Sequence, residues 1–158
     1  MWRNEFQVRA CPRLSSTIAL ASLFALLACG GTYEPRGSRE LADCYATEFG
    51  ATPPAAVSHL RAKQIVIGDF AGQWLQFEAN SSVVSDLVRL GFMPSNRAEF
   101  MRETGGANAP PWWQPEVGHL TTFYIHSRWR PRQFSHSVAV LAHDAEQRVV
   151  YFHHGAFD

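Results

Sequence analysis

The sequence predicts an α+β domain in which one main helix packs on an antiparallel sheet of about five strands, in the order ββα-βββ. A β-branched run and an alternating run surround a glycine-containing loop, a capped amphipathic segment follows them, and three further β-rich runs lie in the carboxyl-terminal third. Short helices are expected in front of the sheet. We place this single domain at residues 38–158.

The first part of the domain is predicted to be a short helix followed by a hairpin. Ser38 begins a segment with apolar residues three and four apart, and Gly50 would end it. Residues 64–67 are rich in β-branched side chains, and residues 73–78 alternate between apolar and polar. Because the glycine-containing loop 68–72 separates these two runs, we expect a β-hairpin.

The main helix is predicted over residues 83–90. The serines at 81–82 supply N-cap side chains, and Gly91 followed by Phe92 matches the pattern of a Schellman stop. A second short helix is expected within 96–103, where an asparagine precedes a glutamate by three positions.

Three strands are predicted in the carboxyl-terminal third. Residues 120–127 alternate, 135–142 are rich in β-forming side chains, and 148–154 return after a polar turn at 144–147. An antiparallel arrangement follows, because connections this short cannot join parallel strands.

The amino terminus predicts export. Three arginines precede an uncharged run of fourteen residues, 15–28, which as a helix would span about 21 Å, less than the ~30 Å core of a bilayer. The run is therefore typical of a signal peptide, residues 1–28, rather than of a membrane span. Its end, Leu26-Leu27-Ala28-Cys29, resembles the lipobox of bacterial lipoproteins. The alternatives are an ordinary signal peptide cleaved nearby and an uncleaved anchor.

The lipobox resemblance implies a covalent lipid on Cys29. Cleavage would follow between Ala28 and Cys29, and residues 29–37, rich in glycine and polar side chains, would form a lipidated tether. The protein would be exported and lipid-anchored to the bacterial membrane, in a Gram-negative source to the outer membrane facing the periplasm. The membrane is thus one expected partner, and no cofactor beyond the lipid is expected.

Charge and cysteine content limit the remaining functions. The 158 residues carry 14 Lys+Arg and 14 Asp+Glu, and removal of residues 1–28 leaves a net charge of about −2. Nothing in this balance attracts nucleic acid, and export argues further against it. Of three cysteines, Cys11 would leave with the signal and Cys29 would be lipidated. Cys44 would then be the free thiol, either buried and inert or available for an intermolecular bond.

No catalytic signature is present, so an enzyme is the least supported class. Histidine is the strongest indication of a metal, because neutral imidazole binds zinc, copper and nickel. His153 and His154 would point to opposite faces of a strand and could not share one ion. His136 could approach one of them across the hairpin, and the turn register decides which. We therefore assign no metal ligands.

The string Pro110-Pro111-Trp112-Trp113 is the most unusual in the chain. Prolines hold the backbone extended and would present two indole rings with little entropy to lose, which suits a sugar, peptide or protein surface. The alternative is that the rings cover an open end of the core with their N–H groups bonded to loop carbonyls.

A basic cluster, Arg128-Trp129-Arg130, could contact phosphates in the envelope, or could be a solvated loop between two strands. We group it with Trp112 and Trp113 as an expected interaction surface. Residues 49–152 resemble small uncharacterised bacterial lipoproteins with a Pro-Pro-Trp-Trp string, and that resemblance implies no activity.

The sequence therefore predicts a membrane-anchored envelope lipoprotein whose domain is a non-catalytic module that binds an envelope protein or polymer. A metal-binding or metal-sensing lipoprotein that uses histidine is the alternative.

Overall fold

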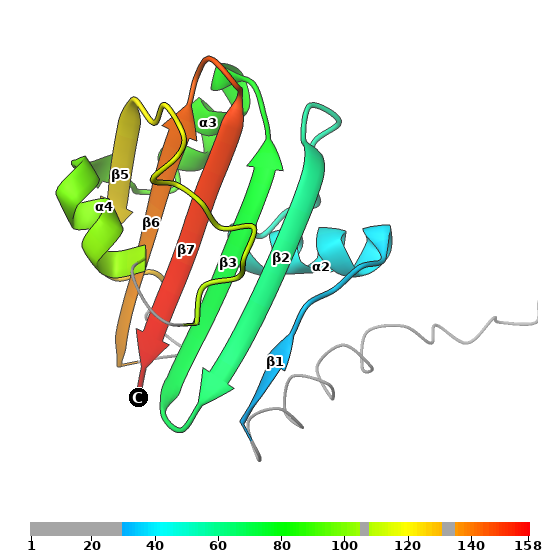
Figure 1. The fold of residues 1–158 in the computed structure, drawn as a ribbon, viewed down its shortest axis with the longest axis vertical. Coiled ribbons are helices and arrows are strands. Elements are labelled where there is room, and N and C mark those ends of the chain that lie inside the picture. Colours follow the sequence, from blue (N-terminus) through cyan, green and yellow to red (C-terminus); the bar gives the residue numbers. More distant parts are fainter. Residues whose placement is uncertain (1–29, 105–107, 131–134) are drawn as a thin grey trace, which may run out of the picture.

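The computed structural model of the protein describes residues 30–104, 108–130 and 135–158 (Figure 1). These residues form one seven-stranded antiparallel sheet with three helices. The strands are β1 (Gly31–Tyr33), β2 (Ser58–Ile67), β3 (Phe70–Glu78), β4 (Met93–Pro94), β5 (Thr122–His126), β6 (His136–Asp144) and β7 (Val149–Phe157). The helices are α2 (Ser38–Phe49), α3 (Ser81–Val88) and α4 (Arg97–Thr104).

The strand order is β1-β2-β3-β7-β6-β5-β4, so the last strand of the chain lies at the centre of the sheet. Strand β7 pairs with β3 over its whole length, with Trp74 opposite His153, and with β6, where Val140 lies opposite the same histidine. A strand with neighbours on both sides exposes none of its backbone to the edge. The backbone of β7 is therefore hydrogen-bonded to a neighbouring strand on each side.

The expected sheet of about five strands with one main helix is wrong. The helix expected from Ser38 forms as α2, but with 12 residues it is longer than the expected main helix α3 of 8. The described residues add two edge strands, β1 of 3 residues and β4 of 2. Strands this short contain too few residues for a period of two to be visible, so sequence pattern does not detect them.

Helices and loops cover both faces of the sheet (Figure 1). Helices α2 and α3 pack on what we call the helix face, and α4 with residues 108–121 covers the opposite side, which we call the loop face. Buried side chains of the helix face include Leu75, Phe77, Leu141, Val150 and Phe152. Those of the loop face are Trp74, Phe100, Trp113, Val140 and Tyr151. The sheet thus separates two apolar cores.

Local chemistry explains where the helices begin and end. Helix α2 ends at Gly50, whose φ of 76° is the left-handed conformation that glycine adopts without strain. Helix α3 is capped by Asn80, whose side chain accepts a hydrogen bond from the backbone N–H of Val83 at 3.0 Å. The sequence placed this cap one position later, on the serines.

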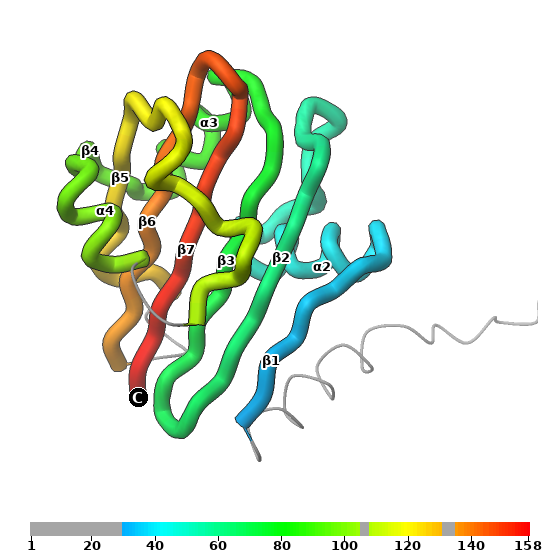
Figure 2. The backbone as a smooth tube through the Cα atoms, in the orientation of Figure 1, coloured from blue at the N-terminus to red at the C-terminus, as the bar shows by residue number. Residues whose placement is uncertain are grey.

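Residues 31–33, which the sequence analysis assigned to the tether, form β1 and pair with β2. The described part of the chain begins at Gly30, so the expected signal peptide 1–28 and Cys29 lie outside the described residues. The start of β1, the β2–β3 turn and the carboxyl terminus lie at the same end of the sheet (Figure 2). Among the described residues, no helix is long and apolar enough to span a bilayer.

Candidate functional site

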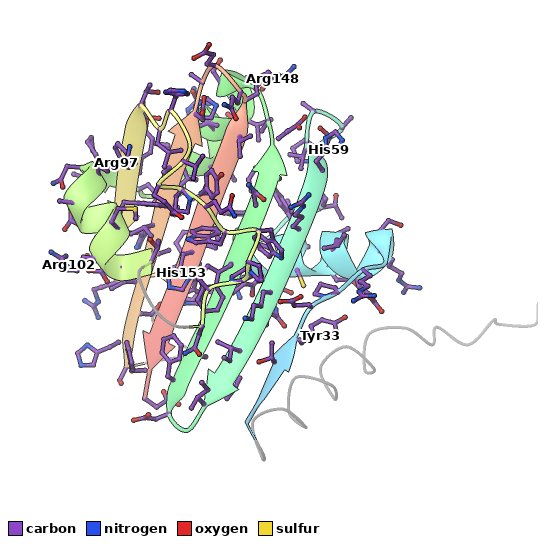
Figure 3. All side chains as sticks on the ribbon, viewed as in Figure 1. Tyr33, His59, Arg97, Arg102, Arg148 and His153 are labelled. Carbon is purple, nitrogen blue, oxygen red and sulfur yellow. The ribbon has the colours of Figure 1, made fainter. Side chains whose placement is uncertain are left out.

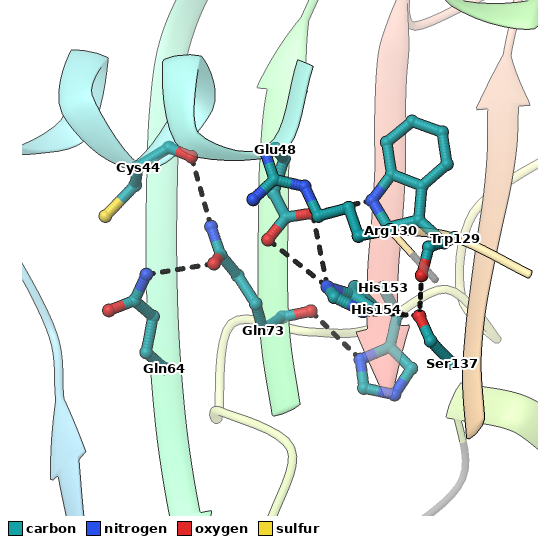
Figure 4. A network of polar contacts seen from close by, with 9 residues as sticks. All are labelled: Cys44, Glu48, Gln64, Gln73, Trp129, Arg130, Ser137, His153 and His154. Carbon is teal, nitrogen blue, oxygen red and sulfur yellow. Dashed lines mark hydrogen bonds and ion pairs between the residues drawn. The ribbon is translucent and has the colours of Figure 1, made fainter. Parts of the chain in front are cut away.

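Two consecutive histidines of β7, His153 and His154, place imidazole rings on opposite faces of the sheet. They are 5% and 6% exposed, so both are enclosed by the protein. Strand alternation sends His154 to the helix face and His153 to the loop face, as the sequence predicts for adjacent strand residues. Figure 4 shows the polar contacts around them.

On the helix face, His154 contacts a buried carboxylate. Its Nδ1 lies 3.2 Å from Oε2 of Glu48, which α2 presents on the same side as its buried apolar residues. The same oxygen accepts a hydrogen bond from Nε1 of Trp129 at 2.8 Å, and Nε of Arg130 lies 3.9 Å away. Burial by itself would raise the Glu48 pKa. The hydrogen bonds and positive charges of these partners together lower the pKa instead, so the group is a carboxylate.

The other ring nitrogen of His154 faces a hydroxyl. Its Nε2 lies 3.0 Å from Oγ of Ser137, so that Glu48, His154 and Ser137 stand in the order of a hydrolase triad. The Ser137 hydroxyl, however, donates its proton to the backbone carbonyl of Trp129. A nucleophilic serine would direct that proton at the imidazole. The arrangement therefore fits a cross-link between α2, β6, β7 and the segment before β6 better than a nucleophile.

Gln73 of β3 connects the two faces. Its side-chain amide donates to the backbone carbonyl of Cys44 at 3.2 Å and accepts from Gln64 at 2.9 Å, both on the helix face. Its backbone carbonyl accepts from Nδ1 of His153 at 3.0 Å (Figure 4).

The Cys44 thiol beside this network is buried, and burial, with help from the Glu48 carboxylate, raises its pKa to about 12. The structure thus places Cys44 in the first of the two expected environments, buried.

On the loop face, His153, which Figure 3 labels, lines a pocket of about 350 Å³. Its ring stacks on the indole of Trp74, with centroids 4.7 Å apart and planes 29° apart. Burial lowers the His153 pKa to about 4, so the ring is neutral at neutral pH. Because Nδ1 donates to the Gln73 carbonyl, the lone pair of the neutral ring is on Nε2.

A second depression on the loop face, which we call the Trp112 groove, is open and holds about 420 Å³. It combines aromatic rings with amide and guanidinium groups. The residues that characterise it are Arg61, Gln76, Trp112, Gln114, Gln147 and Tyr151.

The two tryptophans of the Pro-Pro-Trp-Trp string have different environments. Trp113 is 7% exposed and belongs to the loop-face core, with its ring 5.2 Å from that of Tyr151. Its Nε1 has no hydrogen-bond partner among the described residues, so the expected bond to a loop carbonyl is not made. Trp112 is half-buried and borders the groove. One of the pair can therefore contact a partner without rearrangement of the core.

The basic cluster is also divided by the fold. Arg128 is exposed, Trp129 is 6% exposed in the helix-face core, and Arg130 is half-buried beside Glu48. The five residues of the expected interaction surface therefore do not form one continuous patch. Sequence reasoning missed Glu48, although a carboxylate among the apolar positions of α2 is an unusual placement.

Histidines elsewhere do not gather. The described residues contain no group of three or more His, Cys, Asp or Glu side chains placed to hold a metal ion. No protein-family model, curated protein or solved structure matches the chain. The role of the protein is therefore argued from its sequence and its geometry.

Proposed function

We propose that the protein is an exported lipoprotein, anchored through a lipid on Cys29, whose domain binds an envelope polymer at the Trp112 groove. The anchoring part is supported by the lipobox Leu26-Leu27-Ala28-Cys29 and by the position of β1. Only Gly30 separates Cys29 from the first strand, so the lipid would hold the sheet directly at the membrane surface.

The end of the sheet nearest Cys29 carries apolar side chains. Ile67 at the end of β2 and Phe157 at the end of β7 are 51% and 50% exposed, and both lie at the end where β1 begins (Figure 2). In this orientation the Ile67 side chain meets lipid, and the apolar area removed from water adds to the affinity that the acyl chains supply.

The single observation that carries the binding part is the chemistry of the Trp112 groove. Sugar rings have apolar C–H faces that pack on aromatic rings such as Trp112, and hydroxyls that pair with amides such as Gln76 and Gln114. Gln147 places the groove near the β6–β7 turn, at the opposite end of the sheet from Gly31. An anchored domain would therefore direct this groove away from the bilayer.

Anchoring is tested with the full chain expressed in a bacterium. We expect acyl labelling with palmitate and recovery in the membrane fraction, and loss of both on Cys29→Ser. Labelling that persists in this variant would overturn the lipid assignment.

Polymer binding is tested by sedimentation with purified peptidoglycan sacculi. We expect the wild-type protein to sediment and Trp112→Ala to bind at least ~10-fold more weakly, with Trp112→Phe restoring part of the affinity. Tyr33→Ala is the matched control, because Tyr33 is an exposed aromatic residue of β1 outside the groove. A wild-type protein that stays in solution, or a folded Trp112→Ala that sediments like the wild type, contradicts the proposal.

A further inference from the structure

The pocket around His153 is lined by side chains of the central strands and plays no part in the proposed polymer binding. It lies on the loop face below the carboxyl end of α4, at the opposite end of β7 from the Trp112 groove. The side chains that form its interior are Phe70, Trp74, Val138, His153 and Phe157 around Gly155. All six positions belong to β3, β6 and β7, so the central strands of the sheet hold them in place.

The imidazole of His153 offers one unused acceptor to this pocket. Nδ1 is occupied by the Gln73 carbonyl, and Nε2 has no hydrogen-bond partner among the described residues. The residue is 5% exposed, so bulk water has little access to the ring. Nε2 is not among the solvent-excluded side-chain nitrogens, so it stays accessible from the pocket, and a ligand with an N–H or O–H group would donate to it in place of water.

Gly155 keeps the space in front of this nitrogen open. A Cβ atom at this position would lie 3.4 Å from Nε2 of His153 and 3.7 Å from the Phe70 ring. Any larger residue would therefore fill the volume next to the acceptor. The backbone of Gly155 is not in the left-handed region, so backbone conformation does not explain the glycine.

The inner walls of the pocket are mostly aromatic, and its charged and polar side chains, among them Arg102, Glu103 and His136, come from α4 and the start of β6. The rings of Phe70 and Phe157 lie 5.1 Å apart, and Trp74 stacks on the neutral imidazole. The charges at the rim neutralise each other, since Arg102 donates to Glu103 at 2.8 Å. A net charge on the ligand would therefore lose hydration without gaining a partner. A volume of about 350 Å³ is at the small end of ligand sites.

We propose that the His153 pocket binds a small neutral aromatic molecule that donates one N–H or O–H to Nε2 of His153. Indole and phenol are the simplest members of this class. The ring packs against Trp74 and Phe70, and the donor points at the imidazole. This proposal does not depend on the lipid anchor or on the groove, and each is measured separately.

Calorimetry with the purified full chain in detergent micelles tests whether the ligand must donate a hydrogen bond, with a titration into empty micelles subtracted to remove partitioning. We expect indole to bind at least ~10-fold more tightly than 1-methylindole, which keeps the ring and lacks the N–H. Phenol and anisole form a second pair with the same expected order. Equal affinity within both pairs, or no binding of indole and phenol, overturns the proposal without any variant.

Two substitutions locate the site. Gly155→Ala should weaken indole binding at least ~10-fold, because its Cβ occupies the space beside Nε2. Gly37→Ala is the matched control, since its Cβ would meet only the side chain of Glu40 outside the pocket. In His153→Phe, which keeps a ring and lacks the acceptor, indole and 1-methylindole should bind equally. A preference for indole that survives in folded His153→Phe places the ligand elsewhere and rejects the pocket.

Discussion

Glu48 and His154 lie 106 positions apart in the chain, and the carboxylate of the first is 3.2 Å from the imidazole of the second. The contact joins α2, the first helix of the described chain, to β7, its last strand. Both side chains are buried, so the pair is formed where water cannot replace either partner. A cross-link of this kind is expected to couple α2 to the stability of the sheet.

Glu48→Gln should therefore destabilise the protein strongly. The substitution keeps the size of the side chain and removes the buried carboxylate charge that Trp129, Arg130 and His154 all contact. Breaking a buried pair from one side typically costs about 3–5 kcal/mol. We expect a loss in this range in the free energy of unfolding, measured by urea denaturation.

The exposed Glu116 provides the matched control, and Glu116→Gln should change the free energy of unfolding by less than about 0.5 kcal/mol. A double-mutant cycle with His154→Gln should show a coupling energy above about 1 kcal/mol. Additive losses would mean that Glu48 stabilises the fold through Trp129 or Arg130 rather than through His154.

Ser137 is expected to be structural despite its place in a triad-like order. Ser137→Ala removes the hydroxyl that donates to the Trp129 carbonyl and contacts Nε2 of His154, at a cost of about 1–3 kcal/mol in unfolding free energy. A fluorophosphonate probe, which reacts with activated serines, should not label the native protein. Labelling that disappears in both Ser137→Ala and His154→Gln would instead identify a nucleophile.

Short-range pattern is enough to locate some elements of this fold. The β-branched run before Gly68 and the alternating run after it predict a hairpin where β2 and β3 pair. The main helix also forms, but it spans Ser81–Val88 instead of the predicted 83–90, so the predicted stop at Gly91 is too late in the chain. In contrast, β1 and β4 form because longer neighbouring strands offer them hydrogen bonds. A segment of two or three residues does not indicate that such a neighbour will be available. The number of strands could therefore not be predicted locally.

The candidate sites show the same division. Alternation is sufficient to predict that His153 and His154 point to opposite faces. It cannot supply their partners, because Glu48 and Ser137 are brought to His154 by a sheet in which β7 lies between β3 and β6. For the same reason Trp112 and Trp113, which are adjacent in a rigid string, have different burial.

The Cys44 thiol should be inert in the folded protein. Its pKa is raised to about 12, so at pH 8 about one molecule in ten thousand carries the reactive thiolate, and that sulfur is buried. Alkylation by iodoacetamide, measured by mass spectrometry of the peptide containing Cys44, should occur only after unfolding. Complete modification within minutes under native conditions would show that α2 opens readily.

The burial of neutral His153 should make the protein less stable in mild acid. Its pKa is 6.5 as a free side chain and about 4 in the folded chain, because burial opposes protonation more than the hydrogen bond to Gln73 favours it. Protons therefore bind the unfolded chain more tightly. The contribution of neutral His153 to the free energy of unfolding is complete above about pH 7. It decreases as the pH falls from 6.5 to 4 and changes no further below 4.

The size of this effect follows from the two pKa values. A difference of roughly 2.5 units corresponds to about 3 kcal/mol of unfolding free energy, measured by urea denaturation between pH 7 and pH 4. Other groups titrate nearby. His143, whose pKa burial also lowers, contributes in the same direction below pH 6.5, and Glu48 contributes stability that is lost below its ordinary pKa of 4.5.

The comparison that isolates His153 is therefore the difference between the wild type and His153→Asn, since Asn keeps a donor for the Gln73 carbonyl and does not titrate. The variant should be less stable at pH 7, because the smaller side chain leaves Trp74 without its stacking partner, and its stability should fall less between pH 6.5 and 4. His59→Asn, at an exposed site with a φ of 50° that asparagine tolerates, should keep the wild-type slope. Parallel curves for the wild type and His153→Asn would mean that the ring takes up its proton in the folded state, so that Nε2 would be a donor rather than an acceptor in the pocket.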